Sequence, residues 1–102
     1  MKPRILVVDD EESIREFLDI MLRKEGYDVT CVEDGQKAID ILKKKSFDLV
    51  ISDLQMPNVT GIELLKHCRE NYSEMLFMMI TAFGTAESAV EAMKMGAYDY
   101  LL

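Results

Sequence analysis

Two short apolar runs, each followed within two residues by an aspartate, place the strongest constraint on the fold of this chain. One run covers residues 5–8 and the other covers residues 49–51. Neither alternates with polar residues, as a strand with one solvent-facing side would, so both are expected to be covered on both faces. Strands of this kind are typical of parallel sheets that lie between layers of helices.

Helical patterns separate the strand signals. A capping-box spacing at Ser13 to Glu16 predicts the start of a first helix, and Gly26 predicts its end. A second helix is expected from about Gln36 to Lys45, with a solvated last turn. The residues expected on the buried faces of these two helices are Ile14, Phe17, Leu18, Met21 and Leu22 in the first, and Ala38, Ile39, Ile41 and Leu42 in the second.

The remaining elements follow the same alternation. Another capping-box spacing, Thr60 to Glu63, predicts a helix that runs to about Asn71. A helix that begins near Thr85 and closes at Gly96 is expected to bury small residues and Met93. Further strands are expected over 28–32, within 47–52, over 75–80 and from 98 to 102. Strands and helices alternate four times, so the sequence predicts one α/β domain with a parallel sheet and helices on both faces.

Oxygen-bearing side chains stand at the predicted carboxyl ends of three strands. They are Asp9 and Asp10, Asp53, and Thr81. Functional residues collect at this edge of parallel sheets. Three carboxylates brought together repel one another, and a hard cation relieves the repulsion. Ligands that are all oxygen favour Mg²⁺, or Mn²⁺, over zinc.

The phosphate chemistry of such a site is restricted by what the sequence lacks. It contains neither GxxxxGK[ST] nor GxGxxG, which disfavours nucleotide hydrolysis and dinucleotide binding. The Asp53 carboxylate could itself accept a phosphoryl group, with Thr81 donating a hydrogen bond to the product. Acidic residues at strand ends also serve as turn formers or helix caps, and Thr81 alone fits either role. The spacing of Tyr100 favours a packing role.

Composition narrows the partners and the location. The chain has 102 residues and a net charge of −7, which argues against direct contact with nucleic acid. No apolar stretch approaches the roughly 20 residues that a membrane span needs. Cys31 and Cys68 form no CxxC pair and are expected to be reduced. A cytoplasmic location is therefore expected.

Several motifs in a fixed order carry a family resemblance. They are residues 5–11, with the acidic pair at their end, Asp-Leu-Gln-Met-Pro at 53–57, Gly61, Ile-Thr-Ala at 80–82, and Gly96 and Ala97 followed by Tyr100. Over essentially its whole length the chain resembles a response regulator receiver domain of bacterial two-component signalling. Residues 81–85 and 96–100 further resemble receivers of enhancer-binding transcription activators. The resemblance implies a flavodoxin-like, doubly wound, five-stranded parallel sheet with strand order 2-1-3-4-5.

The resemblance also implies roles for individual residues. Asp53 would be the phosphoacceptor and would take its phosphoryl group from a sensor histidine kinase. Mg²⁺, with Mn²⁺ as an alternative, would be held by Asp10 directly, by Asp9 more indirectly, by Asp53 and by the backbone carbonyl of Gln55. Thr81 would move toward the phosphoryl oxygens and Tyr100 would turn inward. The domain would not be an enzyme beyond self-phosphotransfer and self-dephosphorylation, and an ATPase and DNA-binding output domain would lie outside this chain.

One departure from the family pattern concerns the end of the chain. Receivers carry a lysine just after the fifth strand and then a fifth helix, whereas this sequence ends at Leu102. The expectation is therefore a receiver over residues 1–102 that is truncated at its C-terminus and lacks the final helix. Apolar surface would then be exposed beside the first helix, and the chain is expected to compensate by forming a homodimer or an oligomer with exchanged elements.

Two other functions stay open. One is a docking or dimerisation module of the same fold that is not phosphorylated; the missing lysine favours it, and the acidic residues with Thr81 count against it. The other is a hydrolase with an aspartyl nucleophile. Such enzymes generally need a second acid two residues after the nucleophile, where this chain has Gln55.

Overall fold

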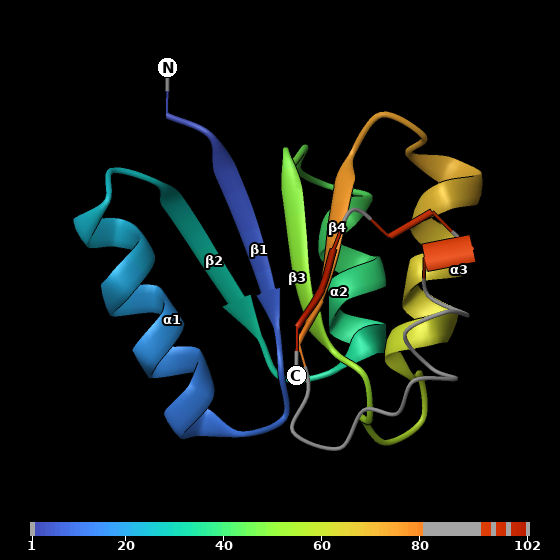
Figure 1. Cartoon of the computed structure of the whole chain (residues 1–102), viewed down its shortest axis with the longest axis horizontal. Coiled ribbons are helices and arrows are strands. Elements are labelled where there is room, and N and C mark those ends of the chain that lie inside the picture. The colour runs from blue at the N-terminus through green and yellow to red at the C-terminus, as the bar shows by residue number, and fades with distance from the viewer. Residues whose placement is uncertain (1, 81–92, 95, 98, 102) are drawn as a thin grey trace.

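The computed structural model describes residues 2–80, 93, 94, 96, 97 and 99–101. Its strands form a single parallel sheet in the order β2-β1-β3-β4-β5 (Figure 1), which confirms the predicted α/β class and strand order. The strands are β1 (Arg4–Val8), β2 (Asp28–Val32), β3 (Leu49–Asp53), β4 (Leu76–Ile80) and β5 (Asp99–Leu101). The described helices are α1 (Glu12–Lys24), α2 (Gly35–Leu42) and α3 (Gly61–Asn71).

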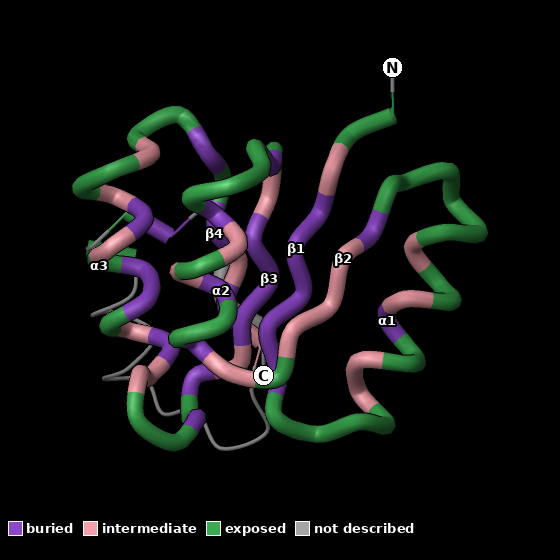
Figure 2. The backbone as a smooth tube through the Cα atoms, turned by 180° about the vertical axis from the view of Figure 1, so that it is seen from behind, coloured by how far each residue is buried: buried purple, intermediate pink, exposed green. Residues whose placement is uncertain are grey.

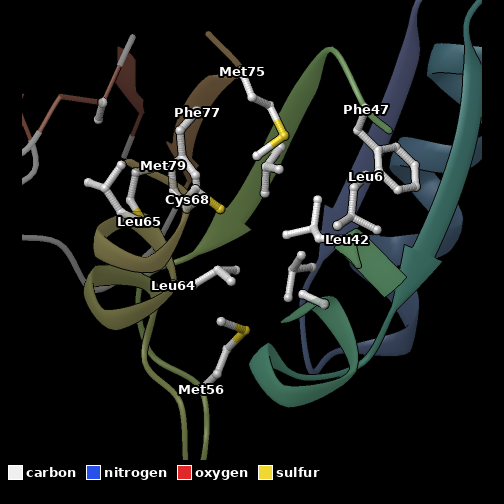
Figure 3. Close-up of a cluster of buried hydrophobic side chains, with 14 of the residues drawn as sticks. Leu6, Leu42, Phe47, Met56, Leu64, Leu65, Cys68, Met75, Phe77 and Met79 are labelled. Atoms are coloured by element: carbon white, nitrogen blue, oxygen red, sulfur yellow. The ribbon is translucent and has the colours of Figure 1, made fainter. Parts of the chain in front are cut away.

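Two apolar clusters lie on opposite faces of the sheet. Ile5 and Val7 of β1 pack with Leu18 of α1, whereas Leu6 and Val8 belong to the cluster that α2 and α3 cover. Successive residues of a strand point to opposite faces, so α1 covers one face and the other two helices cover the second. Figure 2 shows two of the inner strands, β1 and β3, buried along most of their length. The larger cluster is drawn in Figure 3.

Helix α1 differs from its predicted form at two points. It begins at Glu12 after Glu11, and no side chain caps its first turn, so the capping box predicted at Ser13 is wrong. Phe17 is 60% exposed and Met21 is 41% exposed, although both were expected to be buried. They join Ile20, which is 69% exposed, in an apolar strip that we call the α1 flank. Leu18 is the buried residue of α1, and Ile14 and Leu22 are partly buried against the same cluster, because α1 meets β1 and β2 along a narrow line of side chains.

Helix α2 is shorter than predicted. It ends at Leu42, three residues before the expected Lys45, because the N–H groups of Lys44 and Lys45 both donate to the carbonyl of Ile41 and tighten the chain into a turn. Its start is capped by Asp34, whose Oδ1 accepts the N–H of Lys37 at 2.8 Å. Helix α3 agrees with its prediction.

Two predicted helix boundaries are confirmed, at Gly26 after α1 and at Thr60 before α3. Gly26 and Gly96 have φ values of +93° and +98°, which glycine adopts without strain. The capping box of Thr60 and Glu63 is complete. The part of the helix predicted from Thr85 that precedes Met93 lies outside the described residues. Met93 itself is 48% exposed, although it was expected to be buried.

The membrane and cysteine expectations concern the described part of the chain. None of the helices that the structure describes is long and apolar enough to cross a bilayer. Both cysteines are free thiols; Cys68 is buried and Cys31 is half-buried.

Candidate functional site

Three aspartates meet at the carboxyl edge of the sheet, the lower edge in Figure 1. Asp9 and Asp10 follow β1, and Asp53 is the last residue of β3. These strands are neighbours with Val8 opposite Ser52, so the residues after them reach the same level. Their carboxylate oxygens lie within 4.8 Å of one another. The meeting of these residues, predicted from the ends of the apolar runs, is thus observed.

Asp9 is the most buried of the three, with only 7% of its surface exposed. The pKa of this carboxyl is raised from 3.8 to about 6, chiefly by burial and to a smaller extent by the nearby charges of Asp53 and Asp10. The N–H of Glu11 donates to Oδ1 of Asp9 at 2.9 Å and opposes the rise without cancelling it. The site therefore carries negative charge in a place where water solvates it poorly, and a cation would stabilise it.

Arg15 is a part of this site that the sequence did not reveal. Its Nη1 donates to the carbonyl of Asp9 at 2.9 Å and ties the first turns of α1 to the end of β1. This bond fixes the backbone from which Asp9 and Asp10 project. The sequence signal that could have identified Arg15 is its position on the helix that directly follows the acidic pair.

Asp53 is held by its neighbours on both sides. Ser52 is fully buried, and its hydroxyl donates to the carbonyl of Asp53 at 2.9 Å. The N–H of Gly61 donates to the carbonyl of Leu54 at 2.9 Å, so the start of α3 folds back onto the end of β3. A Cβ atom at Gly61 would lie 2.3 Å from the carbonyl oxygen of Asp53, a distance that no side chain could occupy. Gly61 is therefore required for this close approach.

The loop between β3 and α3 is anchored at its far end. Asn58 has a φ of 70°, and the N–H of Val59 donates to the carbonyl of Pro57 at 2.9 Å. Asparagine tolerates this left-handed conformation better than most residues. Val59 then packs against Gly35, where an added Cβ would lie 2.7 Å from the valine side chain. Gln55 lies within this loop with an exposed side chain, and its carbonyl as a metal ligand stays a prediction.

The roles of two further predicted site residues are not tested by the described contacts. Thr81 lies outside the described residues. Tyr100 lies on β5 opposite Met79 of β4, and the position of its side chain is not described. Their switch roles therefore stay predictions.

The three aspartates fit Mg²⁺ by their donor set and by their spacing. All the donors are oxygen atoms, which Mg²⁺ prefers. Two oxygens that share one Mg²⁺ lie at most about 4.2 Å apart, since each bond is close to 2.1 Å. The observed limit of 4.8 Å leaves only a small closure for ligation. A carboxylate beside such a cation can also act as a nucleophile toward phosphorus.

Comparison with known proteins finds a family whose sequence model matches this chain. The family model for the response regulator receiver domain matches residues 5–102. The transcriptional regulatory protein FixJ of Bradyrhizobium diazoefficiens is 41% identical over 100 residues, which are 98% of this chain and 49% of FixJ. The chain thus spans about half the length of that relative.

Solved structures agree in fold. The chemotaxis protein CheY4 of Vibrio cholerae has a TM-score of 0.94 at 34% identity, over 100% of this chain and 87% of that one. The response regulator protein TrrA of Thermotoga maritima, in complex with Mg²⁺-BeF, has a TM-score of 0.89 at 35% identity, over 100% and 86% of the two chains.

Proposed function

Because the chain belongs to the response regulator receiver domain family, we propose that it is a signalling receiver that accepts a phosphoryl group on Asp53. The observation that carries this proposal is the convergence of Asp9, Asp10 and Asp53 from two neighbouring strands. The Mg²⁺-BeF complex of TrrA, a structure 35% identical to this chain, supports the metal requirement.

In the proposed reaction, a carboxylate oxygen of Asp53 attacks the phosphorus of a phosphohistidine on a sensor kinase. The new O–P bond forms as the P–N bond breaks, and the histidine nitrogen keeps the bonding pair and takes a proton. Asp9, Asp10, Asp53 and the carbonyl of Gln55 would hold Mg²⁺, which supplies positive charge for the phosphoryl oxygens when bound. Mn²⁺ could replace it, because it also prefers oxygen ligands.

Thr81 and Tyr100 complete the proposal as switch residues. Thr81 directly follows Ile80, the last residue of β4, and Ile80 lies opposite Asp53. In this proposal the Thr81 hydroxyl donates a hydrogen bond to the phosphoryl oxygens. Tyr100 belongs to the neighbouring strand β5. A phosphoryl group that interacts better with one arrangement of these residues would shift the population toward it.

The partners of the domain follow from the same proposal. A sensor histidine kinase donates the phosphoryl group, and an output domain with ATPase and DNA-binding activity, outside this chain, receives the signal. The similarity to FixJ, a transcriptional regulatory protein, supports a transcriptional output. The domain itself would turn over no substrate beyond its own phosphorylation and dephosphorylation. We place it in the cytoplasm, and its two free cysteines are compatible with a reducing compartment.

The test is phosphorylation in vitro. The protein is incubated with Mg²⁺ and phosphoramidate, and its mass is measured. We expect a gain of one phosphoryl group that is absent when Mg²⁺ is chelated and in Asp53→Ala. Asp40→Ala is the matched control, because Asp40 is an exposed aspartate on α2. A folded protein that forms no adduct would support the docking module instead, and sustained phosphate release over many turnovers would support a hydrolase.

Self-association is a second candidate, because the α1 flank exposes three large apolar side chains on one side of a helix. Such a surface is typical of an interface between protein molecules. A homodimer or an oligomer with exchanged elements would cover it. This role is compatible with phosphorylation and is tested separately by oligomeric state.

A further inference from the structure

A groove at the amino edge of the sheet has no part in the proposed phosphorylation site. It is open to solvent and has a volume of about 540 Å³ between the loop after α2 and the loop after α3. Both loops lie at the edge where β3 and β4 begin, opposite the edge that carries the aspartates (Figure 1). We call it the lysine groove, and its lining comprises residues 42–47 and 72–75.

The floor of the lysine groove is apolar. Leu42, Phe47 and Met75 line it, and each is largely covered by the core. Figure 3 shows Phe47 and Met75 at the same end of the large hydrophobic cluster. A small part of each residue remains accessible, at 5% for Leu42, 8% for Phe47 and 7% for Met75. A bulky apolar group placed there would extend the core outward.

The rim of the groove is basic on one side. Lys43, Lys44 and Lys45 are consecutive and exposed, and the acidic residue of the lining is Glu74 on the other loop. The ion pairs found in the described part of the chain involve Lys37, Arg4 and Arg23, and none of the three rim lysines. A protein with a net charge of −7 thus gathers positive charge beside an apolar floor.

Both walls of the groove are held by hydrogen bonds. The Arg69 guanidinium donates to the carbonyls of Ser73 at 3.2 Å and Tyr72 at 3.4 Å, and also to that of Met75. On the other side, the N–H groups of Lys44 and Lys45 donate to Ile41 at 3.0 and 2.9 Å. A ligand would therefore meet loops that need little ordering, which lowers the entropic cost of binding.

We propose that the lysine groove binds an acidic peptide segment of a partner protein, with a large apolar side chain of that segment against the floor. The charge of the rim selects acidic residues, and the floor selects the apolar residue between them. A lysine run at a helix end is ordinarily a solvated surface. Here the turn after Leu42 carries the lysines beyond the helix and places them beside a preformed apolar hollow.

The probe is a fluorescent, capped peptide in which two glutamates flank one phenylalanine on each side. Its binding to the full chain is measured by fluorescence anisotropy at low and high salt. We expect saturable binding that weakens with salt, because the lysines are exposed. The variant with Lys43→Glu, Lys44→Glu and Lys45→Glu should bind about tenfold more weakly or worse.

A second triple variant controls for net charge. Lys24→Glu, Lys66→Glu and Lys94→Glu change three exposed lysines outside the groove by the same total charge. It should bind the probe as the unchanged protein does, and circular dichroism confirms that both variants are folded. A peptide with alanine in place of phenylalanine should bind more weakly to the unchanged protein.

Three results would overturn the proposal. They are an absence of saturable binding to the unchanged protein, an equal loss of affinity in both triple variants, and equal binding of the alanine peptide. The assay uses no phosphodonor and no Mg²⁺, so its result is independent of whether Asp53 accepts a phosphoryl group.

Discussion

Single residues decide the charge of the acidic site, and Asp9 is the clearest case. Its identity as a site residue could be predicted from the sequence, because it ends an apolar run next to another aspartate. Its difference from Asp10 could not, since burial of Asp9 and exposure of Asp10 depend on how α1 leaves the sheet. Arg15 was not predicted as a site residue, because its hydrogen bond goes to the backbone carbonyl of Asp9, and such a bond leaves no pattern of side-chain types in the sequence.

The raised pKa of Asp9 predicts how the stability of the metal-free protein depends on pH. In the unfolded chain this carboxyl loses its proton near pH 3.8, and in the folded protein near pH 6. Between these values the folded state binds more protons, so the free energy of unfolding falls as pH rises and is level with respect to Asp9 above about 6.

Asp9→Asn should remove this part of the pH dependence and raise the free energy of unfolding at pH 7. A fully desolvated group with this shift would contribute about 3 kcal/mol, and solvent around the cluster reduces the expected gain to about 1 kcal/mol. Urea denaturation at several pH values, with a chelator present, measures it. Asp40→Asn, at an exposed position on α2, is the control. A variant less stable than the unchanged protein at pH 7 would contradict the prediction.

At the scale of elements, the connection from β3 to α3 shapes the site more than either element alone. Its capping box was visible in the sequence as Thr60 followed by Glu63, and the helix start agrees. The crowding around Gly61 was not visible, because it arises from the approach of α3 to the backbone of Asp53. The predicted capping box in α1 failed although its spacing was the same. Spacing alone therefore does not distinguish a cap from an exposed helix turn.

The substitutions Gly61→Ala and Thr60→Ala distinguish an effect on stability alone from an effect on the geometry of the site. The first should destabilise the protein by about 1–3 kcal/mol through overpacking, and the second by about 1 kcal/mol through loss of the cap. Only Gly61→Ala should also weaken Mg²⁺ binding, because the new Cβ displaces the carbonyl of Asp53. Thermal unfolding with and without Mg²⁺ measures both effects. The same Mg²⁺-dependent shift in both variants would contradict the role given to Gly61.

For the whole molecule, the layers of helices and strands could be predicted from the sequence more completely than the outer surface could. Uninterrupted apolar runs and repeated crossovers predicted the parallel sheet, because few other folds bury such strands on both faces. Exposed apolar surface beside the first helix was expected, but its location on α1 itself was not, since periodicity identifies apolar residues on one side of a helix and not how many of them the sheet covers. Phe17 and Met21 fit the helical period and remain exposed.

The α1 flank predicts concentration-dependent association. In light scattering, the average molecular mass of the unchanged protein should increase as its concentration rises, because association covers apolar surface. A double variant, Phe17→Glu with Ile20→Glu, should stay monomeric. Glu12→Gln with Glu16→Gln, at exposed polar positions of the same helix, is the control and should associate as before. A monomeric unchanged protein at high concentration would refute this interface.

The parallel sheet has a consequence for how this domain can diversify. The strands run in the same direction, so from β1 to β4 each chain segment that joins a strand to a helix at the carboxyl edge is separated by that helix from the next segment at the amino edge. The two sets of loops share no residues. Substitutions around the lysine groove would therefore leave the three aspartates unchanged, so the proposed peptide binding and the proposed phosphoryl transfer could diversify independently of each other.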